Sequence, residues 1–215
     1  MTPGRGATIA HLEIRAYPPM MRPWNAAITG GNPMRALAFS LLMLGLAAAP
    51  ATAAEQFKLT SPDIKPGSKI GDMFVFNGFG CTGQNVSPAL SWSGAPAGTK
   101  GYVLTVYDPD APTGSGFWHW VMYDIPASVT SLPQGAGTPG KQPDGAMQGS
   151  TDFGAPGYGG PCPPKGDKPH RYIFTLYAVK ADKLEVPANP TPALVGFVTH
   201  FATLAKASFT ARYGR

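Results

Sequence analysis

Short apolar runs separated by turn-forming residues make up most of the hydrophobic pattern of this chain. The clearest run is residues 102–107 (YVLTVY), which Gly101 precedes and Asp108 follows. Its β-branched and aromatic residues predict a strand that is buried on both faces. Similar runs cover residues 74–79, 118–125 and 172–179. Strands of this length with Gly, Pro and Asp between them predict a mainly β fold, an antiparallel β-sandwich.

The last apolar segment of the chain has a helical period instead. Thr191 is suited to an N-cap and Pro192 to the first helical position. Apolar residues then recur at spacings of three and four, namely Leu194, Val195, Val198, Phe201, Leu204 and Ala205. The pattern predicts an amphipathic C-terminal helix that packs against the sheet.

A long Gly- and Pro-rich loop precedes the strand predicted at residues 172–179. Residues 131–169 contain 10 Gly and 8 Pro among 39 residues, without a clear period. A segment of this kind is either functional or disordered. Its Phe153 and Tyr158 favour an ordered, functional loop.

Residues 34–54 have the layout of a secretory signal peptide. Met34-Arg35 gives a basic start, and residues 36–49 are apolar and uncharged. Because this apolar centre is short for a membrane span, we expect cleavage after Ala53 or Ala54, with an uncleaved anchor as the alternative. The product would be periplasmic or secreted, with no stable membrane insertion.

The signal peptide leaves a single predicted domain, residues 55–215. Residues 1–33 lack apolar periodicity and precede a second possible start at Met34, so we interpret them as a disordered extension or a mis-called start. A length near 160 residues suits one domain with one core.

Composition narrows the class of protein further. Gly supplies 27 and Pro 24 of the 215 residues, which excludes a fold of long helices. A hydrophobic content of 43% against 13% charged residues excludes intrinsic disorder. The chain has 17 Lys and Arg against 12 Asp and Glu. Within residues 55–215 the balance is 13 against 11, which disfavours a nucleic-acid partner.

The two cysteines, Cys81 and Cys162, both lie in the part expected to be exported. Thiols can oxidise in that environment, so we favour a disulfide between them over two free thiols. Such a bridge would contribute on the order of 4 kcal/mol in the chain-entropy model.

Polar residues that a sandwich does not need for packing gather at three places. The first is residues 108–112 (DPDAP), after the clearest strand, and the second is His119 among aromatic residues. The third is residues 160–166 (GPCPPKG), followed by residues 169–172 (PHRY) at the start of another strand. Loops at strand ends present such side chains from a rigid sheet.

These motifs, in this order, resemble the phosphatidylethanolamine-binding protein family, particularly its bacterial Raf-kinase-inhibitor-like branch. The resemblance covers nearly all of the predicted domain, from residues 79–88 (FGCTGQNVSP) through the terminal helix. It implies a sandwich with a C-terminal helix, long Gly- and Pro-rich loops and a small anion-binding pocket at one sheet edge. It implies no cofactor and no bound metal.

The resemblance also assigns residues to that pocket. Asp108, His119, His170 and Tyr172 match the family's pocket residues, while the segment at its rim is matched by Gly160, Pro163 and Pro164. Cys162 is a departure, because animal members have Gly there. A bridge from Cys162 would staple the rim.

The chemistry of these residues suits a phosphate-bearing small molecule or a lipid head group. Two imidazoles and the hydroxyl of Tyr172 can donate hydrogen bonds to phosphate, while Asp108 would orient one imidazole. The Pro-rich rim can aim the amide of Gly160 inward. Trp118 and Trp120 could offer stacking surface, although strand alternation puts both on the face opposite His119.

Each residue also has a plain structural interpretation. Asp108 could cap the turn at Pro109, His119 could be a satisfied core histidine, and His170 could lie on the surface before a strand. Tyr172 alone would be core. We expect Arg171 to form a structural ion pair, and we interpret His200 on the helix as structural.

We therefore expect a binding protein, for which a regulatory role is an option, and not an enzyme. A hydrolase is weaker because no G-x-S-x-G motif occurs, Ser115 has no assigned base, and no closely spaced pair of metal ligands exists. The other alternative is an inhibitor of a protease or kinase that acts through surface loops on an unknown protein partner.

Overall fold

The computed structural model describes residues 55–215, so the predicted extension and signal peptide lie outside the described residues. Its strands are β1 (Lys58–Thr60), β2 (Asn77–Gly78), β3 (Cys81–Thr82), β4 (Leu90–Ser93), β5 (Gly101–Asp108), β6 (Phe117–Pro126), β7 (Ser131–Leu132), β8 (Met147–Gln148), β9 (His170–Val179) and β10 (Thr203–Tyr213). A 3-10 turn, η1 (Asp72–Phe74), and the helix α1 (Pro192–Ala202) complete the fold.

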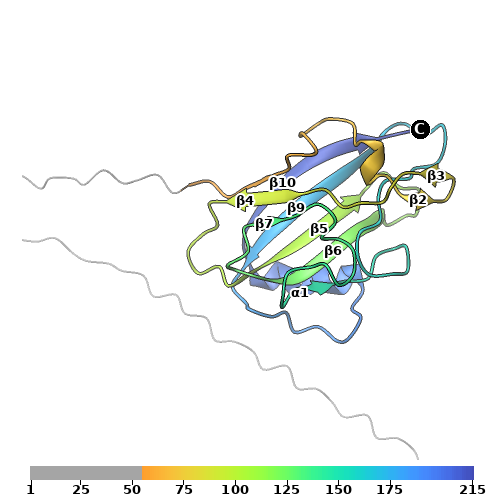
Figure 1. The fold of residues 1–215 in the computed structure, drawn as a ribbon. Coiled ribbons are helices and arrows are strands. Elements are labelled where there is room, and N and C mark those ends of the chain that lie inside the picture. The colour runs from red at the N-terminus through yellow and green to blue at the C-terminus, as the bar shows by residue number, and fades with distance from the viewer. Residues whose placement is uncertain (1–54) are drawn as a thin grey trace, which may run out of the picture. The chain divides into compact units, whose positions relative to one another are not determined.

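A five-stranded antiparallel sheet, in the order β10-β9-β5-β6-β8, forms the middle layer (Figure 1). The three-stranded antiparallel sheet β1-β4-β7 packs on one face of it, and α1 packs on the other. The short β2-β3 ribbon lies at one end of these layers. The predicted mainly β sandwich with a C-terminal helix is therefore confirmed.

The central strand β5 contributes to both hydrophobic cores. Leu104 and Val106 are buried between the two sheets, whereas Val103 is buried on the side of α1. This burial on both faces explains why the run at residues 102–107 is rich in β-branched and aromatic residues and carries no charge, because water reaches neither face. The prediction of a strand buried on both faces is confirmed. Because β5 is packed on both faces, its C-terminal end holds the residues that follow it in a fixed position.

The helix begins as predicted and ends earlier. The hydroxyl of Thr191 accepts a hydrogen bond from the backbone N–H of Leu194, 3.2 Å away, as an N-cap does. The helix stops at Ala202. Leu204 and Ala205, which the pattern placed on it, belong to β10 instead.

The strand β10 was not predicted from the sequence. Its buried residues Ala207, Phe209, Ala211 and Tyr213 follow an alternating period, and all four pair with β9. A helical pattern overlapped its first residues and concealed the change of period.

The predicted strand at residues 74–79 was wrong. Phe74 closes η1, and only Asn77 and Gly78 pair, with β3. Phe79 and Gly80 have φ angles of 50° and 80°, so they form a tight turn with both central residues in the left-handed region. This turn reverses the chain where the apolar run predicted that it would continue.

The segment 131–169 is folded, as its aromatic residues predicted. It contains β7 and β8 and is joined to the rest of the protein through hydrogen bonds. The hydroxyl of Tyr158, for example, donates to the carbonyl oxygen of Phe74 at 2.8 Å.

Candidate functional site

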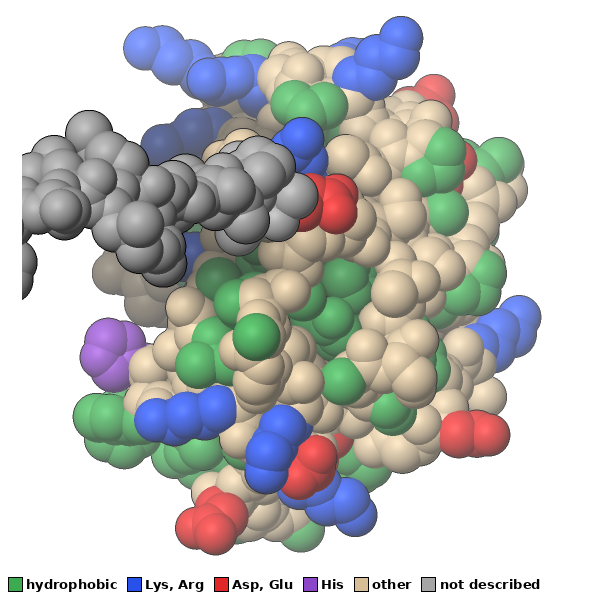
Figure 2. Space-filling model, turned by 90° about the vertical axis from the view of Figure 1, so that its left-hand side faces the viewer, with side chains coloured by type: hydrophobic (Ala, Val, Ile, Leu, Met, Phe, Trp, Pro, Cys, Tyr) green, Lys and Arg blue, Asp and Glu red, His purple; other side chains and the backbone are tan. Residues whose placement is uncertain are grey.

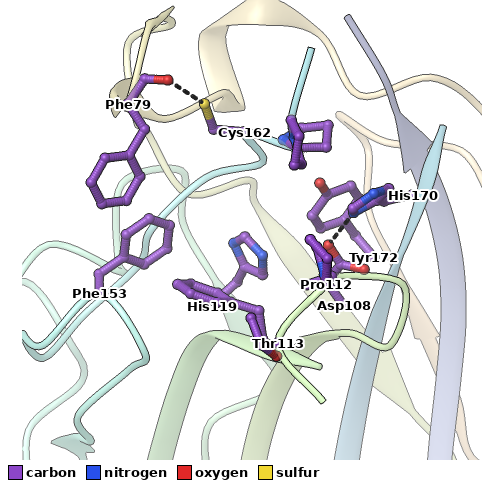
Figure 3. Close-up of a pocket in the computed structure, with 13 residues that line it drawn as sticks. Phe79, Asp108, Pro112, Thr113, His119, Phe153, Cys162, His170 and Tyr172 are labelled. Carbon is purple, nitrogen blue, oxygen red and sulfur yellow. Dashed lines mark hydrogen bonds and ion pairs between the residues drawn. The ribbon is translucent and has the colours of Figure 1, made fainter. Parts of the chain in front are cut away.

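Antiparallel pairing brings the candidate residues to one end of the large sheet. The C-terminal end of β5 lies between the first residues of β6 and β9, where Asp108 pairs with Phe117 and Tyr107 with Ile173. Side chains separated widely in sequence therefore meet there. They surround a cavity of about 170 Å³ (Figure 3).

The cavity contains most of the residues that the sequence singled out. Its lining is Phe79, Asp108, Ala111, Pro112, Thr113, Phe117, His119, Phe153, Cys162, Pro163, Pro164, His170 and Tyr172. The predicted convergence of a carboxylate, two imidazoles and a phenol is present in the structure. Their role in binding a ligand stays a prediction.

Asp108 has two structural partners at once. Its Oδ2 lies 2.7 Å from Nδ1 of His170, and because a carboxylate only accepts, the imidazole donates this bond. Its Oδ1 accepts the backbone N–H of Asp110 at 2.8 Å, which closes the turn after β5. The turn cap and the orienting role expected for Asp108 are therefore both present, on different oxygens.

His170 is held between two carboxylates. Its side chain is 5% exposed, with Nδ1 on Asp108 and Nε2 3.4 Å from the Oδ2 of Asp167. The interpretation of His170 as a surface residue was therefore wrong. Asp167 lies at the outer side of this ring, with 43% of its side chain exposed.

A surface ion pair fixes the turn beside His170. Arg171 donates to both carboxylate oxygens of Asp110 with its side chain and to Oδ2 with its backbone N–H, at distances from 2.7 to 3.2 Å. The guanidinium lowers the pKa of Asp110 to about 2. The structural ion pair expected of Arg171 is thus confirmed.

His119 has a defined tautomer when neutral. Its Nδ1 lies 2.8 Å from the carbonyl oxygen of Gly159, which can only accept, so the proton is on Nδ1 and Nε2 keeps a lone pair. Burial lowers the pKa of this ring, because the charged form would lose its hydration. The carbonyl partner of a core histidine is present, yet the same ring lines the cavity.

Tyr172 has a buried hydroxyl without a partner. The residue is 1% exposed, and among residues 55–215 no donor or acceptor lies within hydrogen-bonding distance of its Oη. Burial also raises the pKa of this phenol, so it stays protonated and can donate. Most buried polar groups are paired, so this hydroxyl beside the cavity keeps its capacity to donate to a molecule that enters it.

The tryptophans do not line the cavity, and the expected alternation fails for one of them. Val106 pairs with Trp120 and Tyr107 with Trp118, so His119 is the extra residue of a β-bulge. Trp120 lies in the core between the sheets, and its indole N–H donates to Gln148. Trp118 packs on the side of α1. The bulge places only Trp118 opposite His119, which contacts Tyr172 on the other side.

Gly160 lies outside the cavity, and its expected inward amide was wrong. The N–H donates to the Oδ1 of Asn85 at 2.7 Å. A Cβ on Gly160 would lie 2.1 Å from the carbonyl oxygen of Phe74, so glycine is needed here for close approach of two segments. Pro163 and Pro164, by contrast, line the cavity as expected.

The predicted disulfide joins Cys81 to Cys162 at the rim, with their Cα atoms 6.0 Å apart. Arg215 supports the same rim from outside. Its guanidinium donates to the carbonyl oxygens of Phe79, Gly80 and Pro163. The tight turn and the Pro-rich segment are therefore connected both covalently and through one side chain.

The aromatic wall of the cavity was missed by the sequence analysis. Figure 3 shows Phe79 and Phe153 on one side and Asp108, His170 and Tyr172 on the other. The ring centroids of Phe79 and Phe153 are 5.9 Å apart, and Phe153 stands 5.4 Å from His119. Phe79 is 72% exposed, and its position between two glycines was the available signal.

Metal binding and serine chemistry are the other candidate activities for the described part of the chain. Residues 55–215 contain no group of three or more His, Cys, Asp or Glu that could hold a metal ion. Ser115 is exposed, does not line the cavity and uses its carbonyl to accept from the hydroxyl of Tyr107. No helix between Glu55 and Arg215 has the length and hydropathy to cross a membrane.

Known proteins resemble this chain in sequence and in fold. Residues 60–214 match the profile of the family "Phosphatidylethanolamine-binding protein". The UPF0098 protein YbcL of Escherichia coli K12 is 52% identical over 74% of this chain and 88% of its own length. Its crystal structure superposes with a TM-score of 0.73 over 75% of this chain and 99% of that one.

Two further relatives extend the comparison. The UPF0098 protein YbhB of Escherichia coli K12 is 51% identical over 73% of this chain and 99% of its own length. A "Putative lipoprotein LppC" of Mycobacterium tuberculosis H37Rv is 38% identical over 67% of this chain and 66% of its own length.

Proposed function

Because this chain belongs to the phosphatidylethanolamine-binding protein family, we propose that it is an exported protein that binds a phosphate-bearing small molecule or phospholipid head group in the cavity beside Asp108. It acts by binding and not by catalysis. The cavity is below the roughly 300–1,000 Å³ typical of drug-sized ligands, which favours a head group over a larger molecule.

The observation that carries this proposal is the unpaired hydroxyl of Tyr172. A buried hydroxyl without a partner costs about 1–3 kcal/mol, and this one stands beside Asp108, His119 and His170, which all have partners. A phosphate oxygen would accept a hydrogen bond from the hydroxyl and remove that cost. The fixed rings of His119 and His170 around it support a pre-formed site.

The donors and acceptors also favour a particular form of the ligand. Neutral His119 presents a lone pair at Nε2, so a phosphate oxygen beside it must share a proton with the ring. Either the phosphate keeps its last proton or the imidazole takes one. The aromatic wall of Phe79, Phe117 and Phe153 would contact the carbon atoms of the ligand.

Binding without catalysis is supported by the partners of the polar groups. Asp108 is occupied on both oxygens, and no hydroxyl or thiol nucleophile in the cavity is paired with a base. Export is supported by the layout of residues 34–54 and by the description of the mycobacterial relative as a putative lipoprotein.

The test is a calorimetric titration with phosphoethanolamine and with inorganic phosphate. Tyr172→Phe removes the hydroxyl alone, so we expect affinity to fall about fivefold or more while the free protein becomes no less stable. Thr199→Val is the matched control, because it removes another buried unpaired hydroxyl that lies in α1 and away from the cavity.

Unchanged affinity in Tyr172→Phe, or an equal loss in Thr199→Val, would contradict the proposal. Export is tested separately from the mass of the protein recovered outside the cytoplasm. A mature N-terminus at Ala54 or Glu55 is expected, and recovery of the protein in the cytoplasm alone, with an uncleaved N-terminus at or before Met34, would count against export.

A further inference from the structure

The outer side of α1 and the first residues of β10 expose large apolar side chains. Phe197 and Phe201 are each 63% exposed and Leu204 is 42% exposed, whereas Val195 and Ala202 on the inner side are buried. The two phenyl rings lie 5.1 Å apart and contact each other. We call Phe197, Phe201 and Leu204 the α1 face.

No charged side chain interrupts this surface. Residues 186–205 contain no Asp, Glu, Lys or Arg, and the exposed His200 is the titratable residue among them. Solvent-exposed helices of soluble proteins normally carry charged residues on their outer side. The paired rings of Phe197 and Phe201 form an exposed apolar patch of the kind that marks an interaction site.

Lysines border the α1 face. Lys180 and Lys183 line a shallow groove together with Val198 and Phe201, and Lys206 follows Leu204 by two residues. Within residues 55–215 none of these lysines forms an ion pair, whereas Lys100 is paired with Asp182. Glu185 is the acidic residue in the groove. Figure 2 shows hydrophobic side chains, a histidine and basic side chains grouped at one edge of the molecule.

This combination fits a lipid surface better than a second copy of the chain. A two-fold contact through the α1 face would bring the same lysines of both copies together, which is repulsive. A large buried aromatic residue covers only about 150–250 Å². Three partly exposed side chains therefore fall short of the roughly 800 Å² that each partner of a stable dimer buries.

We propose that the α1 face is a docking surface for an anionic lipid bilayer. Phe197, Phe201 and Leu204 enter the region between head groups and acyl chains, and Lys180 and Lys183 contact anionic head groups. With 11 residues, α1 lies in the interface and does not span the bilayer. The proposal does not depend on the ligand of the cavity, because α1 packs on the other face of the large sheet from the core that contains Tyr172.

The test uses vesicles with equal parts of phosphatidylglycerol and phosphatidylcholine, and vesicles of phosphatidylcholine alone. The protein is purified in the form that cells produce, and its N-terminus is determined from its mass. We expect sedimentation with the anionic vesicles at 0.1 M salt, and at least tenfold weaker binding at 0.5 M salt or without phosphatidylglycerol.

Two variants locate the contact. Phe197→Ser with Phe201→Ser should weaken binding to anionic vesicles at least fivefold without changing thermal unfolding, because both side chains are exposed. Met147→Ser is the matched control, since Met147 is also exposed but lies on β8 and does not line the cavity. It should leave vesicle binding unchanged.

A third variant places a fluorescent probe on α1 itself, so its result does not depend on which N-terminus the purified protein has. Phe197→Trp should gain fluorescence quenching by brominated lipids beyond that of the parent protein. Absence of that gain would overturn the proposal. So would an equal loss of vesicle binding in Met147→Ser, or a dimer in solution that dissociates when Phe197 and Phe201 are replaced.

Discussion

The cavity end of the large sheet and the α1 face differ in how their side chains are held. At the cavity, Asp108, His119 and His170 each have partners at 2.7–2.8 Å, so their positions are fixed before any ligand arrives. On the α1 face, Phe197 and Phe201 contact each other and solvent. Directional recognition of a small ligand needs fixed polar groups, whereas contact with a broad surface needs exposed apolar area and charge.

The largest expected effect comes from removing the disulfide, which supports the cavity rim and not the α1 face. Cys81→Ala with Cys162→Ala removes a bridge across 81 residues and should lower the free energy of unfolding by about 2–5 kcal/mol. Urea unfolding measures this loss. Affinity for phosphoethanolamine should also fall because the rim is loosened, while vesicle binding at 25 °C should be retained. A loss below about 0.5 kcal/mol would contradict the structural role of the bridge.

A pair of glycines compares the packing of the two regions. Gly160→Ala brings a Cβ to 2.1 Å from a backbone oxygen and should destabilise the protein by about 1–3 kcal/mol or more. Gly196→Ala lies within α1, where nothing stands within 4 Å of the added Cβ, and should stabilise by about 0.5–1 kcal/mol. Thermal unfolding of both variants checks the two signs, and equal effects would refute the comparison.

Acid should act on the cavity through His119. Burial holds the pKa of its ring below 6.5, so the unfolded chain binds more protons below that pH. The stability that the neutral ring contributes is complete above about pH 6.5 and falls as the pH drops, by at most about 1.4 kcal/mol per pH unit. Urea unfolding at pH 5 and pH 7 should show this difference, which His119→Gln should reduce.

Ligand binding should show the opposite dependence on protons. A phosphate monoester loses its last proton near pH 6, and the complex keeps one proton between phosphate and His119. Affinity should therefore fall by up to tenfold per pH unit between pH 7 and pH 9. Calorimetry in buffers of different ionisation enthalpy measures the proton uptake, and zero uptake would exclude this arrangement.

The smallest effect is expected at the surface beside His170. Arg171→Ala should lower the free energy of unfolding only slightly at pH 7, because the pair with Asp110 is partly exposed and screened by solvent. The pKa of Asp110 is lowered to about 2, so the pair contributes fully above about pH 4 and is lost as the pH falls through 2. The difference from the parent protein in urea should therefore disappear in strong acid.

The central strands could be predicted because their runs are long, uncharged and rich in β-branched and aromatic residues. Residues 102–107 and 172–179 lie within β5 and β9, which are covered on both faces. The run at residues 74–79 misled because Phe76 contacts Phe153, 4.3 Å away between ring centroids, instead of packing in a sheet. Its turn at Phe79 depends on hydrogen bonds from Arg215, which local sequence does not reveal.

The site was predicted in its residues better than in its geometry. The motifs identified Asp108, His170 and Tyr172, but the bulge at His119 depends on pairing between strands and has no local signal. The role of Gly160 likewise depends on a segment distant in sequence, because the side chain of Asn85 accepts the hydrogen bond from its N–H. Three-dimensional pairing therefore decides which neighbours of a motif reach the cavity.

Arg215 has a practical consequence for the design of binding assays. Its side chain reaches three carbonyl oxygens at the cavity rim, and Figure 1 shows the C-terminal end beside β2 and β3. A histidine tag fused after Arg215 would place imidazoles close to the cavity entrance, where they would compete with the ligand. Protein for ligand titrations should therefore carry no C-terminal tag, or one that a protease removes without trace.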